Sequence, residues 1–115
     1  MPNITETEYF FTSSEGRTPI HVREWTPDCD LNGVVQISHG INEYIGRYEN
    51  FARYLASKGF VVVGNDHLGH GQSLLSPDRL GYFADSDGWY HVVDDIDELR
   101  RRTHEKYPEL PYFML

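Results

Sequence analysis

The stretch that decides the fold is residues 60–73, FVVVGNDHLGHGQS, in which an apolar run leads directly into a polar loop rich in glycine and histidine. Two further short apolar runs stand at residues 34–37 (VVQI) and 112–115 (YFML). Unbroken apolarity over so few residues is typical of strands that are covered on both faces in a parallel sheet. The three runs therefore predict strands of a parallel sheet in an α/β protein.

Helical patterns lie between these runs. The first has an apolar face whose members recur at i, i+3, i+4 and i+7: Tyr48, Phe51, Ala52 and Leu55. Gly59 is placed to end this helix as the first residue beyond its C-terminus. The second pattern predicts a helix over about residues 88–106, with a candidate N-cap among residues 85–87. Its apolar stripe is Val92, Ile96 and Leu99.

The second helical pattern also carries a dense run of charges. The acidic members come before the basic ones: Asp94, Asp95, Asp97 and Glu98, then Arg100, Arg101 and Arg102. This order suits the helix dipole, and the i,i+4 spacing pairs Asp97 with Arg101 and Glu98 with Arg102. We expect this run to form a solvent-exposed face of the helix.

The first third of the chain predicts an antiparallel hairpin. Residues 9–12 (YFFT) and 20–25 (IHVREW) are rich in β-forming side chains, and the turn-rich residues 13–16 (SSEG) follow the first of them. A hairpin followed by alternating strands and helices predicts an open, mostly parallel sheet with helices on both faces. In such sheets, functional groups gather in the loops at the carboxyl ends of the strands.

The composition excludes several classes of function. The 115 residues carry 18 acidic and 10 basic side chains, a formal net charge of −8, which is unsuited to binding the phosphate backbone of a nucleic acid. Cys29 is the single cysteine, so no disulfide forms within the chain. No apolar run reaches the roughly 18 residues of a membrane span. We expect a soluble cytoplasmic protein with no transmembrane segment and no nucleic-acid partner.

The loop of residues 38–48 (SHGINEYIGRY) follows the predicted strand at residues 34–37. Gly40 permits a sharp turn there, and such a turn leaves a backbone amide pointing outward. The amide of Ile41 is placed to donate a hydrogen bond to a developing oxyanion, which needs a fixed N–H and no particular side chain. The residues alone leave open an ordinary strand-to-helix turn in which His39 is a structural histidine.

The loop of residues 65–73 fits two known kinds of site poorly. Gly69 and Gly71 match part of a dinucleotide-binding fingerprint, but the third glycine is missing and no helix follows at once. Asp66, His67 and His70 match no strong zinc-binding pattern, so we expect no metal and no cofactor. A tight polar turn held by internal hydrogen bonds is the expectation that remains.

A nucleophile at Ser86 is also disfavoured. Residues 84–88 (ADSDG) fall one residue short of Gly-x-Ser-x-Gly, and residues 81–83 make a poor buried strand, which that elbow requires. A serine between two aspartates is better suited to capping a helix.

Taken together, the two loops resemble the α/β-hydrolase superfamily, and within it the monoacylglycerol lipases and lysophospholipases of the serine aminopeptidase S33 group. The family pattern His-Gly-x-x-Glu-x-x-x-Arg-Tyr stands at residues 39–48, and Asp-His-x-Gly-His-Gly-x-Ser stands at residues 66–73. Residues 107–115 (YPELPYFML) are similar to the run into the fifth strand of that family. The resemblance spans nearly the whole chain and implies an α/β-hydrolase fold, with an initial antiparallel hairpin followed by parallel βαβ units.

The resemblance also implies roles for individual residues. Ile41 supplies one oxyanion-hole amide, in a turn that His39 and Gly40 shape. The residues expected to brace the first loop on the helix are Glu43, Arg47 and Tyr48. Those expected to hold the second loop compact, as support and not as catalytic acid or base, are Asp66, His67, Gly69, His70, Gly71 and Ser73. Asn42 and Tyr44 are expected to line the acyl pocket.

In this family the fifth strand leads straight into the Gly-x-Ser-x-Gly elbow that carries the nucleophile, and this chain ends at Leu115. No residue matches the nucleophile, the second oxyanion amide, the acid, the catalytic histidine or the lid. The resemblance therefore implies that residues 1–115 are the N-terminal part of a single α/β-hydrolase domain, with an incomplete sheet and no activity alone.

The intact protein is then expected to be a serine ester hydrolase of monoacylglycerol or lysophospholipid-type esters. Its expected partners are that lipid or other ester substrate and the C-terminal remainder of the same domain. Two alternatives stay open. One is a degenerate, non-catalytic α/β module that binds a partner through its open sheet edge. The other is a different chemistry on the same fold, such as that of haloperoxidases or dehalogenases.

Residues 112–115 are where either the remainder of the domain or a binding partner would be expected to pair with the sheet. A strand of large apolar residues with no following helix leaves an uncovered edge, which invites pairing or aggregation. Each large apolar side chain left uncovered forgoes roughly 1.5–3 kcal/mol of burial. We therefore expect the isolated chain to be marginally stable unless a complementary segment completes the sheet.

Overall fold

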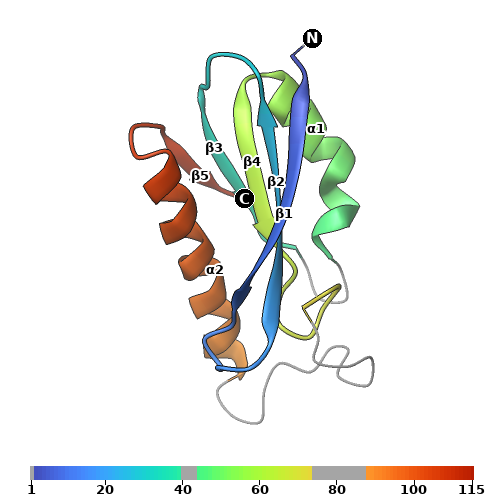
Figure 1. Cartoon of the computed structure of the whole chain (residues 1–115), viewed down its shortest axis with the longest axis vertical. Coiled ribbons are helices and arrows are strands. Elements are labelled where there is room, and N and C mark those ends of the chain that lie inside the picture. Colours follow the sequence, from blue (N-terminus) through green and yellow to red (C-terminus); the bar gives the residue numbers. More distant parts are fainter. Residues whose placement is uncertain (1, 40–43, 74–87) are drawn as a thin grey trace.

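The computed structural model describes residues 2–39, 44–73 and 88–115. Its strands are β1 (Ile4–Thr12), β2 (Pro19–Pro27), β3 (Gly33–Ile37), β4 (Phe60–Asn65) and β5 (Tyr112–Met114). Its helices are the short 3-10 helix η1 (Ile45–Tyr48), α1 (Glu49–Ser57) and α2 (Gly88–Lys106). The elements follow the predicted order (Figure 1). The candidate caps at residues 85–87, with Ser86 among them, lie outside the described residues.

Within the described residues the strands form a mixed sheet in the order β1-β2-β4-β3-β5. β1 and β2 pair antiparallel with Phe11 opposite Ile20, which confirms the predicted hairpin and extends both of its strands. β3 lies between β4 and β5 and is parallel to both, so that Val35 stands opposite Val62 and Phe113. An antiparallel pairing of β2 with β4 joins the hairpin to the parallel strands. The predicted combination of a hairpin and a parallel sheet is therefore confirmed.

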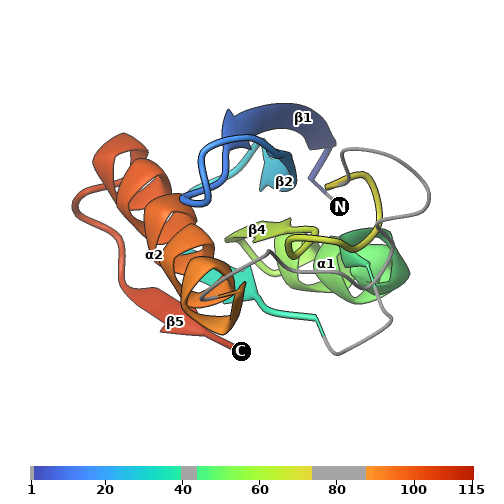
Figure 2. The ribbon, with the colours of Figure 1, turned by 90° about the horizontal axis from the view of Figure 1, so that it is seen from below.

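The two faces of the sheet build two separate cores. The core shared with α2 consists of Phe11, Ile20, Val22, Val34, Val61, Val63, Leu68, Val92 and Leu99. The core shared with η1 and α1 consists of Trp25, Val35, Ile37, Ile45, Ala52, Ala56 and Val62. The two α-helices accordingly cover opposite faces of the sheet, as predicted (Figure 2). β3 and β4 contribute consecutive residues to both cores, which explains why their sequences are apolar almost throughout.

The predicted apolar face of α1 is only partly correct. Ala52 and Ala56 are fully buried, whereas Phe51 is 43% exposed. Small side chains at the buried positions allow the helix axis to approach the sheet closely, and the larger ring lies to the side of that contact. Gly59 ends the helix as predicted, with a φ of +94°. A Cβ at Gly59 would lie 2.5 Å from Nδ2 of Asn32, so the position also excludes a side chain by space.

Helix α2 places Val92 and Leu99 against the sheet, as predicted. The predicted ion pairs are confirmed: Asp97 with Arg101 and Glu98 with Arg102, each with an N–O distance of 2.7 Å. These pairs lie on the exposed side of the helix. None of the helices within the described residues combines the length and the apolarity that crossing a bilayer requires.

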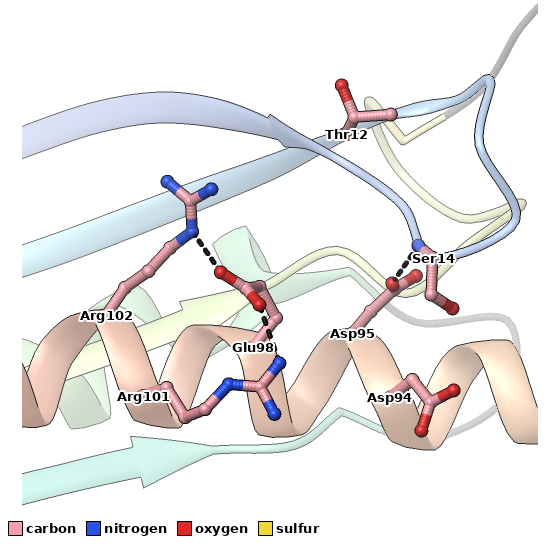
Figure 3. A pocket seen from close by; sticks show the side chains of 7 residues that line it. All are labelled: Thr12, Ser14, Asp94, Asp95, Glu98, Arg101 and Arg102. Atoms are coloured by element: carbon pink, nitrogen blue, oxygen red, sulfur yellow. Dashed lines mark hydrogen bonds and ion pairs between the residues drawn. The ribbon is translucent and has the colours of Figure 1, made fainter.

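Asp95 corrects the expectation that the whole charge run faces solvent. It is only 1% exposed, because the turn between β1 and β2 covers it. Ser13 Oγ donates to Asp95 Oδ2 at 2.6 Å. The amide of Ser14 donates to Asp95 Oδ1 at 2.8 Å, as Figure 3 shows. Burial raises the pKa of Asp95, although both hydrogen bonds oppose the rise. A buried carboxyl group thus joins the hairpin to α2.

Strand β5 departs from the expectation that all three apolar runs are covered on both faces. Phe113, Met114 and Leu115 are 51%, 49% and 63% exposed. Phe113 packs its ring edge-on against Phe60 at a centroid distance of 6.5 Å. Leu115 continues the ladder beyond the strand, because its amide donates to Gln36 O at 2.9 Å. β5 is therefore well paired with β3 while its apolar side chains lie open at one edge of the described sheet.

Replacing Gly64 of β4 tests how closely η1 approaches the sheet. A Cβ at this position would overlap Cδ1 of Ile45 and would lie 2.9 Å from the carbonyl oxygen of Ile37. We expect Gly64→Ala to lower the free energy of unfolding by about 1–3 kcal/mol, the usual cost of overpacking a core. Urea denaturation of the protein measures this change.

The matched control is the pair Gly64→Ala and Ile45→Val. Valine removes Cδ1 of Ile45, so the double variant should be more stable than the sum of the two single effects predicts. Strict additivity, or a stable Gly64→Ala variant, would show that η1 does not pack against Gly64 in this way.

Candidate functional site: the loops after β3 and β4

The carboxylate of Asp66 joins three parts of the molecule at the end of β4. Asp66 is 2% exposed, and its Oδ1 accepts a hydrogen bond from the amide of Ile45 at 2.7 Å. Its Oδ2 accepts from the amide of Gln72 at 3.0 Å and lies 2.7 Å from Nδ1 of His21. Burial opposes ionisation, but the hydrogen bonds from His21, Gln72 and Ile45 outweigh it and lower the pKa of Asp66. The buried carboxylate is therefore charged, and its charge is compensated locally.

The loop after β4 is a tight polar turn, and the predicted internal hydrogen bonds are present. The amide of Gly69 donates to Ser73 O, and the amide of Ser73 donates to His70 O, both at 2.9 Å. Gly71 has a φ of +52°, and a Cβ there would lie 2.5 Å from Oδ2 of Asp66. Because Gly71 leaves room for the carboxylate, the turn can close directly over Asp66.

Ser73 connects this turn to the hairpin. Its Oγ donates to the carbonyl oxygen of Asp66 at 2.7 Å and accepts from the amide of His21 at 2.9 Å. The amide of Asp66 in turn donates to His21 O at 2.9 Å. Both ends of the turn are therefore bonded to the same residue of β2.

Three buried histidines, His39, His67 and His70, pack beside the turn. The ring centroid of His39 lies 3.9 Å from that of His67 and 5.4 Å from that of His70. Nε2 of His67 lies 3.1 Å from the carbonyl oxygen of His39 and 3.2 Å from Oγ of Ser38. Burial, together with the neighbouring ring of His39, lowers the pKa of His67 to about 4. His67 is therefore neutral near pH 7.

Both flanks of residues 40–43 are held by consecutive residues of the loop after β4. On one side, the amide of His67 donates to Nε2 of His39 at 2.8 Å. On the other side, the amide of Ile45 donates to Asp66. Of the residues between His39 and Ile45, four lie outside the described residues: Gly40, Ile41, Asn42 and Glu43. The structure thus gives the anchoring on either side of the predicted oxyanion-hole residue.

The other predicted site residues of the first motif lie on or beside η1. Tyr44 precedes η1 and is 50% exposed. Arg47 is exposed, and Tyr48 is half-buried against the core shared with α1. These residues lie directly before α1, which begins at Glu49.

His21 is a member of this site that the sequence did not single out. The hairpin pattern places it on one face of a strand with Arg23 and Trp25, which carries no sign of a functional contact. Its neighbour Val22 stands opposite Asn65, and this register brings His21 beside Asp66. A local pattern does not reveal the pairing of β2 with β4, so the contact could not be predicted from the residues around His21.

A polar hollow of about 410 Å³ lies between the β1–β2 turn and α2, away from both motifs (Figure 3). Four of its charged side chains already have partners: Arg101 and Arg102 pair with Glu98 at 2.6 and 2.7 Å, and Asp95 is bonded to the hairpin. We regard it as the junction of the hairpin and the helix. Within the described ranges, no group of three or more His, Cys, Asp or Glu side chains could hold a metal ion.

Comparison with known proteins identifies relatives of the whole chain. Residues 30–115 match the family model described as serine aminopeptidase, S33. The chain is 40% identical over 115 residues to a monoacylglycerol lipase of Mycolicibacterium smegmatis, a match that covers all of this chain and 39% of that protein. It is 37% identical over 94 residues to the human monoglyceride lipase, which covers 81% of this chain and 29% of that protein.

Among solved structures, the chain is similar to a highly thermostable carboxyl esterase from Bacillus coagulans in complex with glycerol. The TM-score is 0.87 at 33% identity, over 95% of this chain and 35% of that chain. This chain therefore spans less than two fifths of the length of each of these relatives. Because the family match covers both loop motifs and most of the chain, the protein belongs to the serine aminopeptidase S33 family and has the α/β-hydrolase fold with an incomplete sheet.

Proposed function

We propose that this chain is the N-terminal part of a serine-dependent carboxylic ester hydrolase that acts on monoacylglycerol or lysophospholipid-type esters. The observation that carries the proposal is the pair of hydrogen bonds by which His67 and Asp66 hold His39 and Ile45, on either side of residues 40–43. The relatives support the substrate class, since two of them are monoglyceride lipases and one is a carboxyl esterase. In this proposal Ile41 supplies one backbone amide of the oxyanion hole.

Ester hydrolysis through an acyl-enzyme develops negative charge on the carbonyl oxygen of the substrate. An N–H that is already fixed in place stabilises this charge without reorganising during the reaction, and one such donor accounts for roughly 10²–10³-fold in kcat. The hydrogen bonds that hold His39 and Ile45, on either side of residues 40–43, support a fixed donor at Ile41 in this proposal.

The electrostatics of the two loops also suit this role. A free carboxylate near a developing oxyanion would repel it, but the negative charge of Asp66 is offset by three hydrogen-bond donors. His67 beside it stays neutral, because its pKa is lowered to about 4. We infer that Asp66, His67, Gly69, His70, Gly71 and Ser73 support the loop and take no part in proton transfer.

A further segment of the same domain supplies the nucleophile, the acid, the catalytic histidine and the second oxyanion amide in this proposal. The exposed apolar side chains of Phe113, Met114 and Leu115 are the surface on which that segment would pack. Burying them is worth roughly 1.5–3 kcal/mol for each large side chain. The sum is a substantial part of the ~5–15 kcal/mol that stabilises a typical domain.

The same open edge at β5 also favours a second candidate, a non-catalytic module that binds a partner by adding a strand. The partner would meet the free edge of β5 and the side chains of Phe113 and Met114. The two candidates differ in whether the protein carries a reactive serine, which an assay of activity decides.

The first prediction concerns the reaction itself. We expect the whole protein, as its gene encodes it, to hydrolyse a monoacylglycerol and a short-chain nitrophenyl ester and to react with a fluorophosphonate probe. Residues 1–115 alone should do neither, because one oxyanion donor without a nucleophile forms no acyl-enzyme. Turnover by residues 1–115 that Ser86→Ala abolishes would contradict this assignment. An unreactive whole protein would favour the partner-binding module.

The second prediction concerns the amide of Ile41. Ile41→Pro removes the N–H, and we expect kcat of the whole protein to fall by roughly 10²–10³-fold. Ile41→Val retains the amide and should keep activity close to that of the unaltered protein. Thermal denaturation of both variants separates loss of the donor from loss of folding. An active Ile41→Pro variant would remove Ile41 from the oxyanion hole.

The third prediction concerns Asp66. Asp66→Asn replaces one carboxylate oxygen with an NH2 group, which only donates. Because both oxygens of Asp66 accept hydrogen bonds, at least one buried N–H loses its acceptor. We expect the free energy of unfolding to fall by about 1–3 kcal/mol and the activity to fall with it. The matched control is Asp97→Asn, which makes the same chemical change in an exposed ion pair of α2 and should cost at most about 0.5 kcal/mol. Equal effects in the two variants, measured by urea denaturation, would show that Asp66 is not a structural centre.

A further inference from the structure

His21 lies between two carboxylates that come from different parts of the fold. Its Nδ1 is 2.7 Å from Oδ2 of Asp66, and its Nε2 is 2.6 Å from Oε1 of Glu8 on β1. The side chains of His21 and Asp66 are each 3% exposed, whereas that of Glu8 is 53% exposed. We call these three residues the Glu8–His21–Asp66 bridge.

Counting protons in this bridge fixes the charge of the ring. A neutral imidazole has one N–H, and an ionised carboxylate has only acceptors. Both ring nitrogens of His21 lie within hydrogen-bond distance of carboxylate oxygens, so both must donate if the two carboxylates are ionised. Asp66 is held ionised by two backbone amides, and Glu8 is half-exposed to water. With both carboxylates ionised, the geometry requires a doubly protonated, positively charged ring.

The bridge acts on the site through Asp66. Because Nδ1–H of His21 takes one lone-pair direction of Oδ2, it fixes the rotation of the carboxylate. That rotation is the one in which Oδ1 meets the amide of Ile45 and Oδ2 meets the amide of Gln72. We propose that charged His21 is a positioning residue, which orients the Asp66 carboxylate and thereby holds Ile45 and the loop after β4 in place for the proposed ester hydrolysis. This inference rests on that proposed function.

The charged groups that face His21 come from the elements packed against it. Glu8 from β1 and Asp66 from the loop after β4 both favour the charged ring, while the Phe10 ring lies 5.2 Å away and carries no charge. His67, the titratable neighbour of Asp66, is neutral. Burial lowers the pKa of His21, but the hydrogen bonds to Asp66 and Glu8 outweigh it and raise the pKa overall.

The raised pKa of His21 and the lowered pKa of Asp66 have opposite consequences for the way stability depends on pH. Because the pKa of His21 is raised on folding, its contribution to stability is complete below the ordinary histidine pKa and is lost as the pH rises through the raised value. Because the pKa of Asp66 is lowered, its contribution is complete above the ordinary aspartate pKa and is lost as the pH falls through the lowered value. The bridge is therefore intact in the window between these limits and opens on the alkaline side when His21 loses its proton.

The test replaces the outer carboxylate with a neutral group of the same shape. In Glu8→Gln, the new side-chain amide donates to Nε2 of a neutral ring while Nδ1–H still donates to Asp66. The bridge then needs no charge on His21. Glu105→Gln, at an exposed position of α2, makes the same change of charge away from the bridge and is the matched control.

In the whole protein, NMR titration of the histidine rings should show the midpoint of His21 moving to lower pH in Glu8→Gln and staying in place in Glu105→Gln. The loss of stability that we expect of the unaltered protein as the pH rises through the His21 midpoint should shrink in Glu8→Gln alone. An unmoved midpoint would overturn the charged state of His21. His21→Phe, which keeps a ring of similar size, should remove the alkaline loss of stability altogether.

Activity tests the positioning role separately. The unaltered protein should lose kcat, and not affinity for the ester, as the pH rises through the His21 midpoint, and Glu8→Gln should lack this alkaline decline. A shifted midpoint with an unchanged profile of kcat would overturn the positioning role. If the whole protein hydrolyses no ester, the proposed function fails, while the NMR and stability measurements still decide whether the bridge is charged.

Discussion

The two loops depend on the hydrogen bonds that the buried carboxylate of Asp66 accepts. A charge removed from water is stable only where donors replace the lost hydration, and Asp66 meets two backbone amides and an imidazole ring. Each donor comes from a different segment, so satisfying the carboxylate also fixes three segments relative to one another. The space for it is provided by Gly71, where any side chain would collide with the carboxylate.

Features with a local signal could be predicted from the sequence. Short apolar runs indicated β3 and β4, and the positive φ of Gly59 and the ion pairs of α2 followed from spacing alone. The two loops were recognised through their resemblance to a family, because a turn of polar residues has no distinctive periodicity. The structure adds how those loops are tied together, which no spacing along the chain reveals.

Features that depend on distant residues could not be predicted. His21 and Asp66 are 45 residues apart, and Ser13 and Asp95 are 82 residues apart, so their contacts exist only once β2 pairs with β4 and the hairpin reaches α2. An apolar pattern likewise shows that a side chain is hydrophobic, but it does not show which residues cover that side chain. Phe51 on α1 and Phe113 on β5 fit their patterns and are nevertheless half-exposed, because burial depends on the neighbouring surface.

The β1–β2 hairpin supports the loop after β4, although the two segments are far apart in the sequence. β1 and β2 contribute no residue that touches the reacting atoms in the proposed reaction, yet the backbone of His21 on β2 holds both ends of the loop after β4. A variant without the β1–β2 hairpin would keep both sequence motifs intact and lose the support that gives the second one its shape.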